Sequence, residues 1–168
     1  MNSSLDFVTN YFSEEKIESL FFIIIGSIAV LLALIFLLII KYSFFKGMAI
    51  PLLLVGTMEL IVGSKIYQRT PSDIVRVEQN IKTNTRDLQT IEIPRIEIVL
   101  QNFVIYKWIE ICLILTSIIL ILVFYKSPQT FWKGLGLGLL IQACLLLCLN
   151  VMAEQRAETY LHFLLQIV

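Results

Sequence analysis

The stretch that most constrains the fold of this chain is a long run without charge. Leu20–Ile40 is 21 residues long and contains no charged side chain. As an α-helix, a run of this length spans about 30 Å, the thickness of the hydrocarbon core of a bilayer. A soluble domain would have to bury the whole run, whereas a membrane accommodates it directly. The run therefore predicts a membrane-spanning helix.

Three further runs predict three further spans. Gly134–Ala153 is 20 residues long and free of charge, and Gly47–Ile66 carries only Glu59 and Lys65. Residues 103–125 combine a charge-free stretch with a short amphipathic start. The composition agrees with a bilayer environment, because 58% of the residues are hydrophobic and only 15% are charged.

The first span is not expected to be a cleaved signal peptide. It is too long, it follows the acidic pair Glu14 and Glu15, and no small-residue cleavage site comes after it.

Short connections predict how the spans are arranged. KYSFFKG at 41–47 and KSPQTFWKG at 126–134 reverse the chain within a few residues. Spans one and two are therefore antiparallel neighbours, and so are spans three and four. We expect an all-α fold, an integral membrane four-helix bundle made of two transmembrane hairpins with a polar helical segment between them.

This expectation divides the chain into four segments. They are residues 1–66 with spans at about 18–40 and 47–66, a polar amphipathic connector at 67–102, residues 103–153 with spans at about 103–125 and 134–153, and a C-terminal helix at 154–168 that lies at the interface or against the bundle.

The connector carries its own helix signals. TPSD at 70–73 predicts a helix start capped by Thr70, and Pro94 predicts a break before the helix that enters span three. Between these points, apolar residues recur at steps of three, four and seven, which predicts one apolar stripe on a charged helix. The stripe consists of Ile74, Val77, Ile81 and Leu88.

Both turns contain the same motif. FFKG at 44–47 and FWKG at 131–134 each open an apolar run, and each run closes on Gln-Arg, 23 positions after the lysine. Duplication of a two-helix unit explains the match, and so does the bilayer thickness that all spans share. In both cases the lysine snorkels, the aromatic ring anchors at the headgroups and the glycine permits close packing. The expected interface anchors are Lys46, Trp132, Lys133, Arg69 and Arg156.

Charge distribution gives conflicting signals about orientation. The tight turns hold four lysines and no acid, whereas the side of the termini holds nine Lys and Arg residues. The positive-inside rule counts Lys and Arg, so it favours both termini in the cytoplasm, although the density of lysines in the turns favours the opposite.

Glu59 is the first candidate for a functional residue. It lies 12 positions after Gly47, inside the hydrocarbon. An intramembrane carboxylate requires a partner, a proton or a water-filled cavity. Two interpretations stay open: Glu59 lines a transport path, or it holds helices together through Gln142, Asn150 or Thr57.

Span four contains a second set of candidates. Gln142 and Asn150 share a helix face with small residues, a pattern typical of contacts with another helix of the same chain, of a second copy or of a partner. The glycines expected at helix contacts are Gly56, Gly63, Gly134 and Gly138.

Catalytic motifs are not found in the sequence. It contains no P-loop, no H-E-x-x-H and no glycine fingerprint, and its single histidine, His162, lies in the apolar tail. We therefore expect no enzyme activity, no catalytic residue, no metal site and no cofactor. With a net charge of zero, nothing indicates a nucleic-acid partner.

Residues 102–164 resemble a group of known proteins. W-K-G-x-G-L-G-L, here Trp132–Leu139, and A-E-x-R-x-x-x-Y, here Ala153–Tyr160, are similar to elements in the second hairpin of small four-span bacterial inner-membrane proteins of unassigned activity. Proteins of this form often protect a bacterium from membrane-targeting toxins. The resemblance implies a multi-pass, immunity-type protein of the bacterial inner membrane.

The expected function is therefore a non-enzymatic interaction protein. Besides the lipid bilayer, its expected partners are a toxin, a subunit of a membrane complex or a second copy of the chain. The alternative is a small oligomeric transporter or channel for ions, protons or small molecules that uses Glu59.

Overall fold

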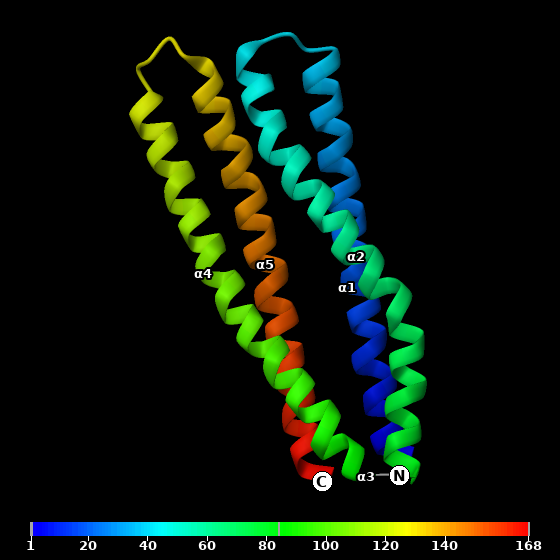
Figure 1. The fold of residues 1–168 in the computed structure, drawn as a ribbon. Coiled ribbons are helices and arrows are strands. Elements are labelled where there is room, and N and C mark those ends of the chain that lie inside the picture. The colour runs from blue at the N-terminus through cyan, green and yellow to red at the C-terminus, as the bar shows by residue number, and fades with distance from the viewer. Residues whose placement is uncertain (1, 84, 168) are drawn as a thin grey trace.

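The computed structural model describes residues 2–83 and 85–167, and nearly all of them are helical (Figure 1). The elements are α1 (Asn2–Leu38), α2 (Ser43–Thr83), α3 (Thr85–Asp87), the π-helical turn η1 (Leu88–Glu92), α4 (Ile93–Phe124) and α5 (Thr130–Ile167). Within the described residues, four helical stretches are long and apolar enough to cross a membrane. The predicted all-α membrane bundle is confirmed, and the chain is a multi-pass membrane protein.

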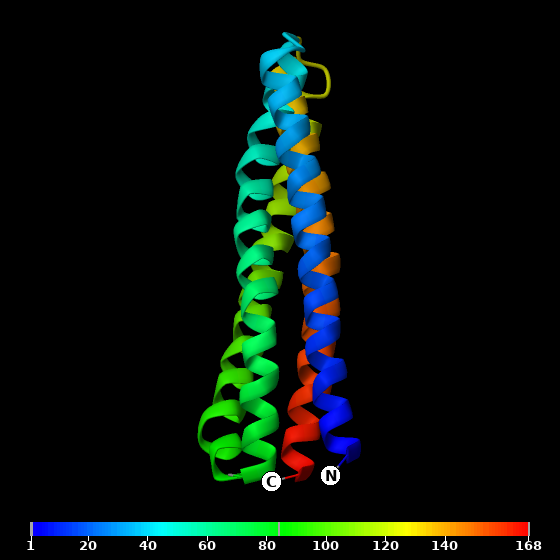
Figure 2. The same ribbon diagram turned by 90° about the vertical axis from the view of Figure 1, so that its right-hand side faces the viewer.

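The helices form two antiparallel hairpins. Residues 39–42 join α1 to α2, and residues 125–129 join α4 to α5. Both of these turns lie at one end of the molecule, and both termini lie at the other (Figures 1 and 2). We call the end with the termini the polar end, because the connector 67–102 lies there.

In the half with the turns, the bundle is open, because its four helices lie side by side in one layer (Figure 1). α1 packs on α2, α2 on α5 and α5 on α4. α2 and α5 are therefore the inner pair, and α1 and α4 lie at the two edges (Figure 1). Since α2 and α5 both run from the turns to the polar end, they are parallel.

Two helix boundaries differ from the predictions. α2 does not start anew at Thr70 but continues from the membrane through Pro71 to Thr83. The Thr70 hydroxyl does not act as a cap, because it donates to the Ile66 carbonyl of the preceding turn at 2.7 Å. α1 begins at Asn2, well before the span predicted at about 18–40.

At the polar end, a π-helical turn precedes α4. η1 (Leu88–Glu92) leads directly into α4, and Pro94 falls in the first turn of that helix. At this position the missing N–H of proline costs nothing, because the first N–H groups of a helix have no partner within it. In place of the break predicted at Pro94, the structure has a change from π-helix to α-helix one residue earlier, at Ile93.

The polar end has a closed hydrophobic core. Tyr11 and Tyr160 stack with their ring centroids 3.9 Å apart, and Phe7 stacks on Phe163 at 4.1 Å. The predicted stripe of the connector faces this core. Its fully enclosed members come from all four long helices and η1: Val8, Tyr11, Phe12, Val77, Leu88, Ile96, Tyr160 and Leu164.

The repeated motifs pack against each other. A Cβ atom on Gly47 would overlap the carbonyl oxygen of Phe131, and a Cβ atom on Gly134 would overlap the carbonyl oxygen of Phe44. FFKG and FWKG are thus reciprocal surfaces of one contact between the parallel helices α2 and α5. The match between the motifs has a packing cause, because each glycine admits the backbone of the other motif.

The other glycines expected at helix contacts also lie between helices. A Cβ atom on Gly56 would lie 3.1 Å from the Gly26 carbonyl oxygen, and one on Gly63 would lie 2.8 Å from the Ser19 carbonyl oxygen. One on Gly138 would lie 2.7 Å from the carbonyl oxygen of Met48. Small residues therefore line the contacts of α2 with both of its neighbours.

We predict that Gly134→Val destabilises the fold because its side chain has no room beside α2. The free energy of unfolding should fall by about 1–3 kcal/mol, the usual cost of overpacking. Unfolding in detergent micelles measures the change. Cys144→Val, at an exposed position of the same helix, is the matched control and should change stability by less than about 0.5 kcal/mol. Equal effects of the two variants would contradict the close contact.

Candidate functional site

Glu59 joins the two hairpins inside the membrane. Its side chain on α2 is only 2% exposed, and Gln142 Nε2 on α5 donates a hydrogen bond to Glu59 Oε2 at 3.4 Å. The second oxygen, Oε1, is buried and meets no donor among the described residues. Of the three partners considered for Glu59, Gln142 is the one that the structure brings to it.

The other two candidates lie elsewhere. Thr57 is exposed, and its hydroxyl donates to the Leu53 carbonyl of its own helix at 2.6 Å. Asn150 is buried against α4, where its Nδ2 donates to Glu110 Oε2 at 3.1 Å and to the Phe103 carbonyl at 3.3 Å.

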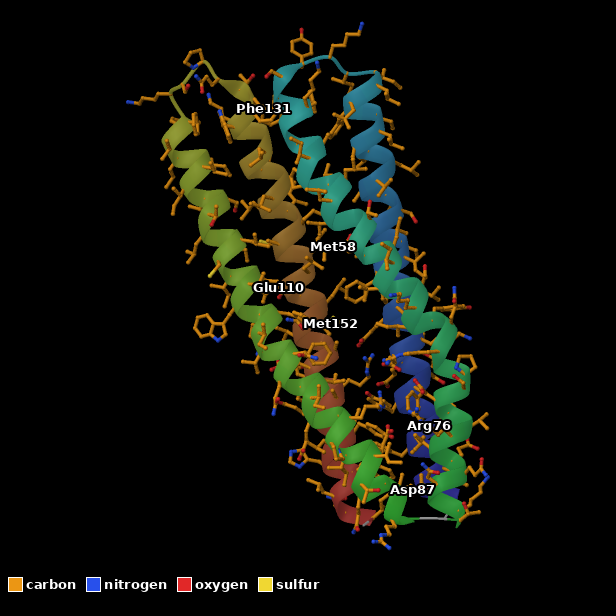
Figure 3. The ribbon with its side chains drawn as sticks, viewed as in Figure 1. Met58, Arg76, Asp87, Glu110, Phe131 and Met152 are labelled. Atoms are coloured by element: carbon orange, nitrogen blue, oxygen red, sulfur yellow. The ribbon has the colours of Figure 1, made fainter. Side chains whose placement is uncertain are left out.

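The contact of Asn150 reveals a second buried acid, Glu110, in the third predicted span. Glu110 is 6% exposed and lies on the side of α4 that faces α5 (Figure 3). Pairing the polar residues on the facing sides of the second hairpin would have found this contact. Each hairpin thus offers one carboxylate to an amide side chain of α5.

At the polar end, Glu92 is the centre of a buried network. It is 1% exposed, and Arg95 donates to its two oxygens at 2.6 and 3.1 Å. The Tyr160 hydroxyl donates to Glu92 at 3.1 Å, and the Arg76 guanidinium donates to Glu92 at 3.4 Å. Arg76 also pairs with Asp73 at 3.0 Å, so the network joins α2, η1, α4 and α5.

Two buried tyrosines at the polar end, Tyr11 and Tyr160, have raised pKa values. Burial, together with the charge of Glu15, raises the pKa of Tyr11 to about 12. Burial and the charge of Glu92 raise the pKa of Tyr160 further above its ordinary value. Both hydroxyls therefore keep their protons at physiological pH, and Tyr160 remains a donor to Glu92.

The two repeated arginines both bind α1. Arg69 Nη2 lies 2.8 Å from Glu15 Oε1, and Arg156 forms an ion pair with Glu18. Arg156 also lies over the ring of Tyr11, 5.4 Å from its centroid. The arginines expected as interface anchors thus also hold α1 from two helices at once.

The remaining anchors lie near the turns. Trp132 stacks on Phe124 with ring centroids 5.5 Å apart, while Lys46 is exposed and Lys133 is half-buried. At the opposite interface, Lys107 of α4 and Glu154 of α5 form an ion pair at 2.5 Å.

Metal-ligating side chains do not cluster in the described part of the chain. No group of three or more His, Cys, Asp or Glu residues there is arranged to hold an ion.

Comparison with known proteins finds no significant match among family models, curated proteins or solved structures. Function has to be inferred from the residues of this chain.

We predict that Glu59 and Gln142 stabilise the fold as a pair. Gln142→Leu leaves both carboxyl oxygens of Glu59 without a donor, whereas Glu59→Leu combined with Gln142→Leu removes both polar groups. A double-mutant cycle by unfolding in detergent should give a coupling energy of about 0.6–1.7 kcal/mol. Thr57→Val with Gln142→Leu is the control cycle and should show no coupling. A coupling near zero for the Glu59 pair would contradict the contact.

The raised pKa values of Tyr11 and Tyr160 predict that the folded state loses stability at alkaline pH. The folded state holds the protons of Tyr11 and Tyr160 more tightly than the unfolded chain does. The free energy of unfolding should therefore fall as the pH rises above about 10, the ordinary pKa of tyrosine. Unfolding measured between pH 9 and 12 should show a smaller fall for Tyr11→Phe and Tyr160→Phe. Tyr42→Phe, at a position 77% exposed, should behave like the natural chain, and an equal slope in all variants would contradict the assignment.

Proposed function

We propose that this protein is a non-enzymatic interaction protein of the bacterial inner membrane, of the immunity type, which binds the hydrophobic helices of a membrane-targeting toxin. The observation that supports this proposal is the uncovered apolar face of α2, an inner helix. Leu54, Met58 and Ile61 follow one another at helical spacing and are 64%, 65% and 52% exposed. The layer leaves this face open to lipid or to another helix.

The chemistry of the face suits an incoming helix. Met58 is flexible and polarisable, so it adapts to the surface of a partner, and the neighbouring Thr57 is small (Figure 3). In lipid, helices associate through close packing rather than through the hydrophobic effect. A toxin helix that packs better than lipid chains would therefore be held there.

The buried polar groups support a binding role over a transport role. Glu59, Gln142, Glu110 and Asn150 are used in contacts between helices of the same chain. They stabilise the layer and leave its apolar faces to a partner.

In this proposal both termini are cytoplasmic. The nine Lys and Arg residues on the side of the termini support this orientation through the positive-inside rule. The polar end then offers the partner a second contact surface outside the membrane, which includes exposed Lys82, Arg86 and Glu97.

The alternative is an oligomeric transporter or channel. The specific observation in its favour is Glu59 Oε1, a buried acceptor without a donor among the described residues, where a proton or cation would bind. Such a path would require further copies of the chain. Two surface hollows, of about 480 and 430 Å³, lie at the polar end, away from Glu59.

The test is survival of bacteria, with and without this protein, when they are challenged with any membrane-targeting toxin that is encoded beside its gene. The natural chain should protect. Met58→Trp should lower protection at equal protein level by about tenfold, which corresponds to about 1.4 kcal/mol of lost binding. Ile28→Trp is the matched control, because Ile28 is 52% exposed on α1 and lies away from the proposed face.

Two outcomes would contradict the proposal. One is protection unaffected by Met58→Trp. The other is proton or ion flux in liposomes that Glu59→Gln abolishes, which would favour the transporter.

A further inference from the structure

A groove runs between α1 and α5 at the polar end. It has a volume of about 480 Å³, within the range typical of small-molecule sites. Glu18 and Met152 lie at one end of the groove, next to the apolar runs of α1 and α5, and Phe7 lies at the other end. The groove therefore starts at the membrane interface and extends away from the bilayer.

Arg156 in the groove has an N–H group that no acceptor among the described residues satisfies. Arg156 lines the groove, pairs with Glu18 and lies over Tyr11. Its Nε is buried and meets no hydrogen-bond acceptor among the described residues. Guanidinium donors favour the oxygens of a phosphate, so an acceptor of this kind would gain hydrogen bonds here.

The rim of the groove is polar and acidic. Asn10 and Glu14 of α1 are exposed on one wall, and Gln155 of α5 is exposed on the other. With Glu14, Glu18 and Arg156, the groove holds two carboxylates and one guanidinium. This balance favours a ligand that brings a cation together with its phosphate.

We propose that the groove binds the headgroup of an amine-bearing, zwitterionic phospholipid such as phosphatidylethanolamine. The phosphate contacts the guanidinium of Arg156, and the ammonium group contacts the carboxylate of Glu14. The acyl chains leave past Met152, which is 53% exposed at the membrane end of the groove. A headgroup with a net negative charge fits less well, because it would meet an excess of carboxylates.

The position of the groove favours a lipid over a soluble ligand of the same chemistry. An interfacial groove places the phosphate at headgroup level while the chains stay in the hydrocarbon. A soluble phosphoethanolamine compound would lack the contact with Met152 and would bind more weakly.

Thermal unfolding of the full chain in detergent tests the proposal, with dioleoyl phosphatidylethanolamine, dioleoyl phosphatidylglycerol and soluble glycerophosphoethanolamine as probes. Phosphatidylethanolamine should raise the Tm by about 5 °C or more when it is well above its Kd. Phosphatidylglycerol and the soluble compound should raise the Tm by less than half as much.

Charge reversal on the rim sharpens the test. Glu14 is exposed, so Glu14→Lys should leave the fold intact while it changes the groove from one excess negative charge to one excess positive charge. In this variant phosphatidylglycerol should raise the Tm more than phosphatidylethanolamine does. Glu158→Lys, an exposed position of α5 outside the groove, is the matched control and should keep the preference of the natural chain.

Three results would overturn the proposal. The first is equal stabilisation of the natural chain by both lipids. The second is a preference that Glu14→Lys and Glu158→Lys change to the same extent. The third is full stabilisation by glycerophosphoethanolamine, which would make the ligand a soluble phosphoamine rather than a lipid.

Discussion

The reciprocal contact between Gly47 and Gly134 is the constraint on which the membrane part of this protein depends. In lipid, the hydrophobic effect does not drive one apolar helix against another, so close packing and hydrogen bonds have to do so. Each glycine admits the carbonyl oxygen of the opposite motif, which brings α2 and α5 together at the turns. That approach brings Glu59 within 3.4 Å of Gln142 further along the same pair of helices. The hairpins would otherwise be two separate units joined by the connector.

The two ends of the molecule are held by different forces. Near the turns and within the bilayer, glycine contacts and two carboxylate–amide pairs hold the four helices in a layer. The apolar faces of this layer are exposed to lipid. At the polar end, water is the solvent, so burial of aromatic and aliphatic side chains adds stability, and the Glu92 network is satisfied inside the same core. A bundle closed at one end and open along the membrane presents apolar surfaces without having to unfold. That arrangement agrees with a protein that binds a partner within the bilayer.

Some contacts could be predicted from the sequence, and others could not. The depth of Glu59 in the hydrocarbon predicted that it has a polar partner, and Gln142 was one of the three partners considered. Glu110 was not expected to be buried, because it lies next to the end of its charge-free run, where a carboxylate at the membrane interface is common. Thr70 and Pro71 form a strong helix-start signal, but a longer helix crosses them, because packing of the polar end, where Val77 is fully buried, outweighs local preference.

The sequence by itself determined the four spans, the two hairpins and the repeated turns, because hydropathy, bilayer thickness and short connections act locally along the chain. Only the tertiary structure decided that α2 and α5 form the inner pair, that each motif is the packing surface of the other, and that Arg69 and Arg156 both bind α1. The physical reason is that helices in lipid select neighbours by fit and by single polar pairs. These pairs join residues far apart in the chain, as Glu59 and Gln142 are, which are 83 positions apart.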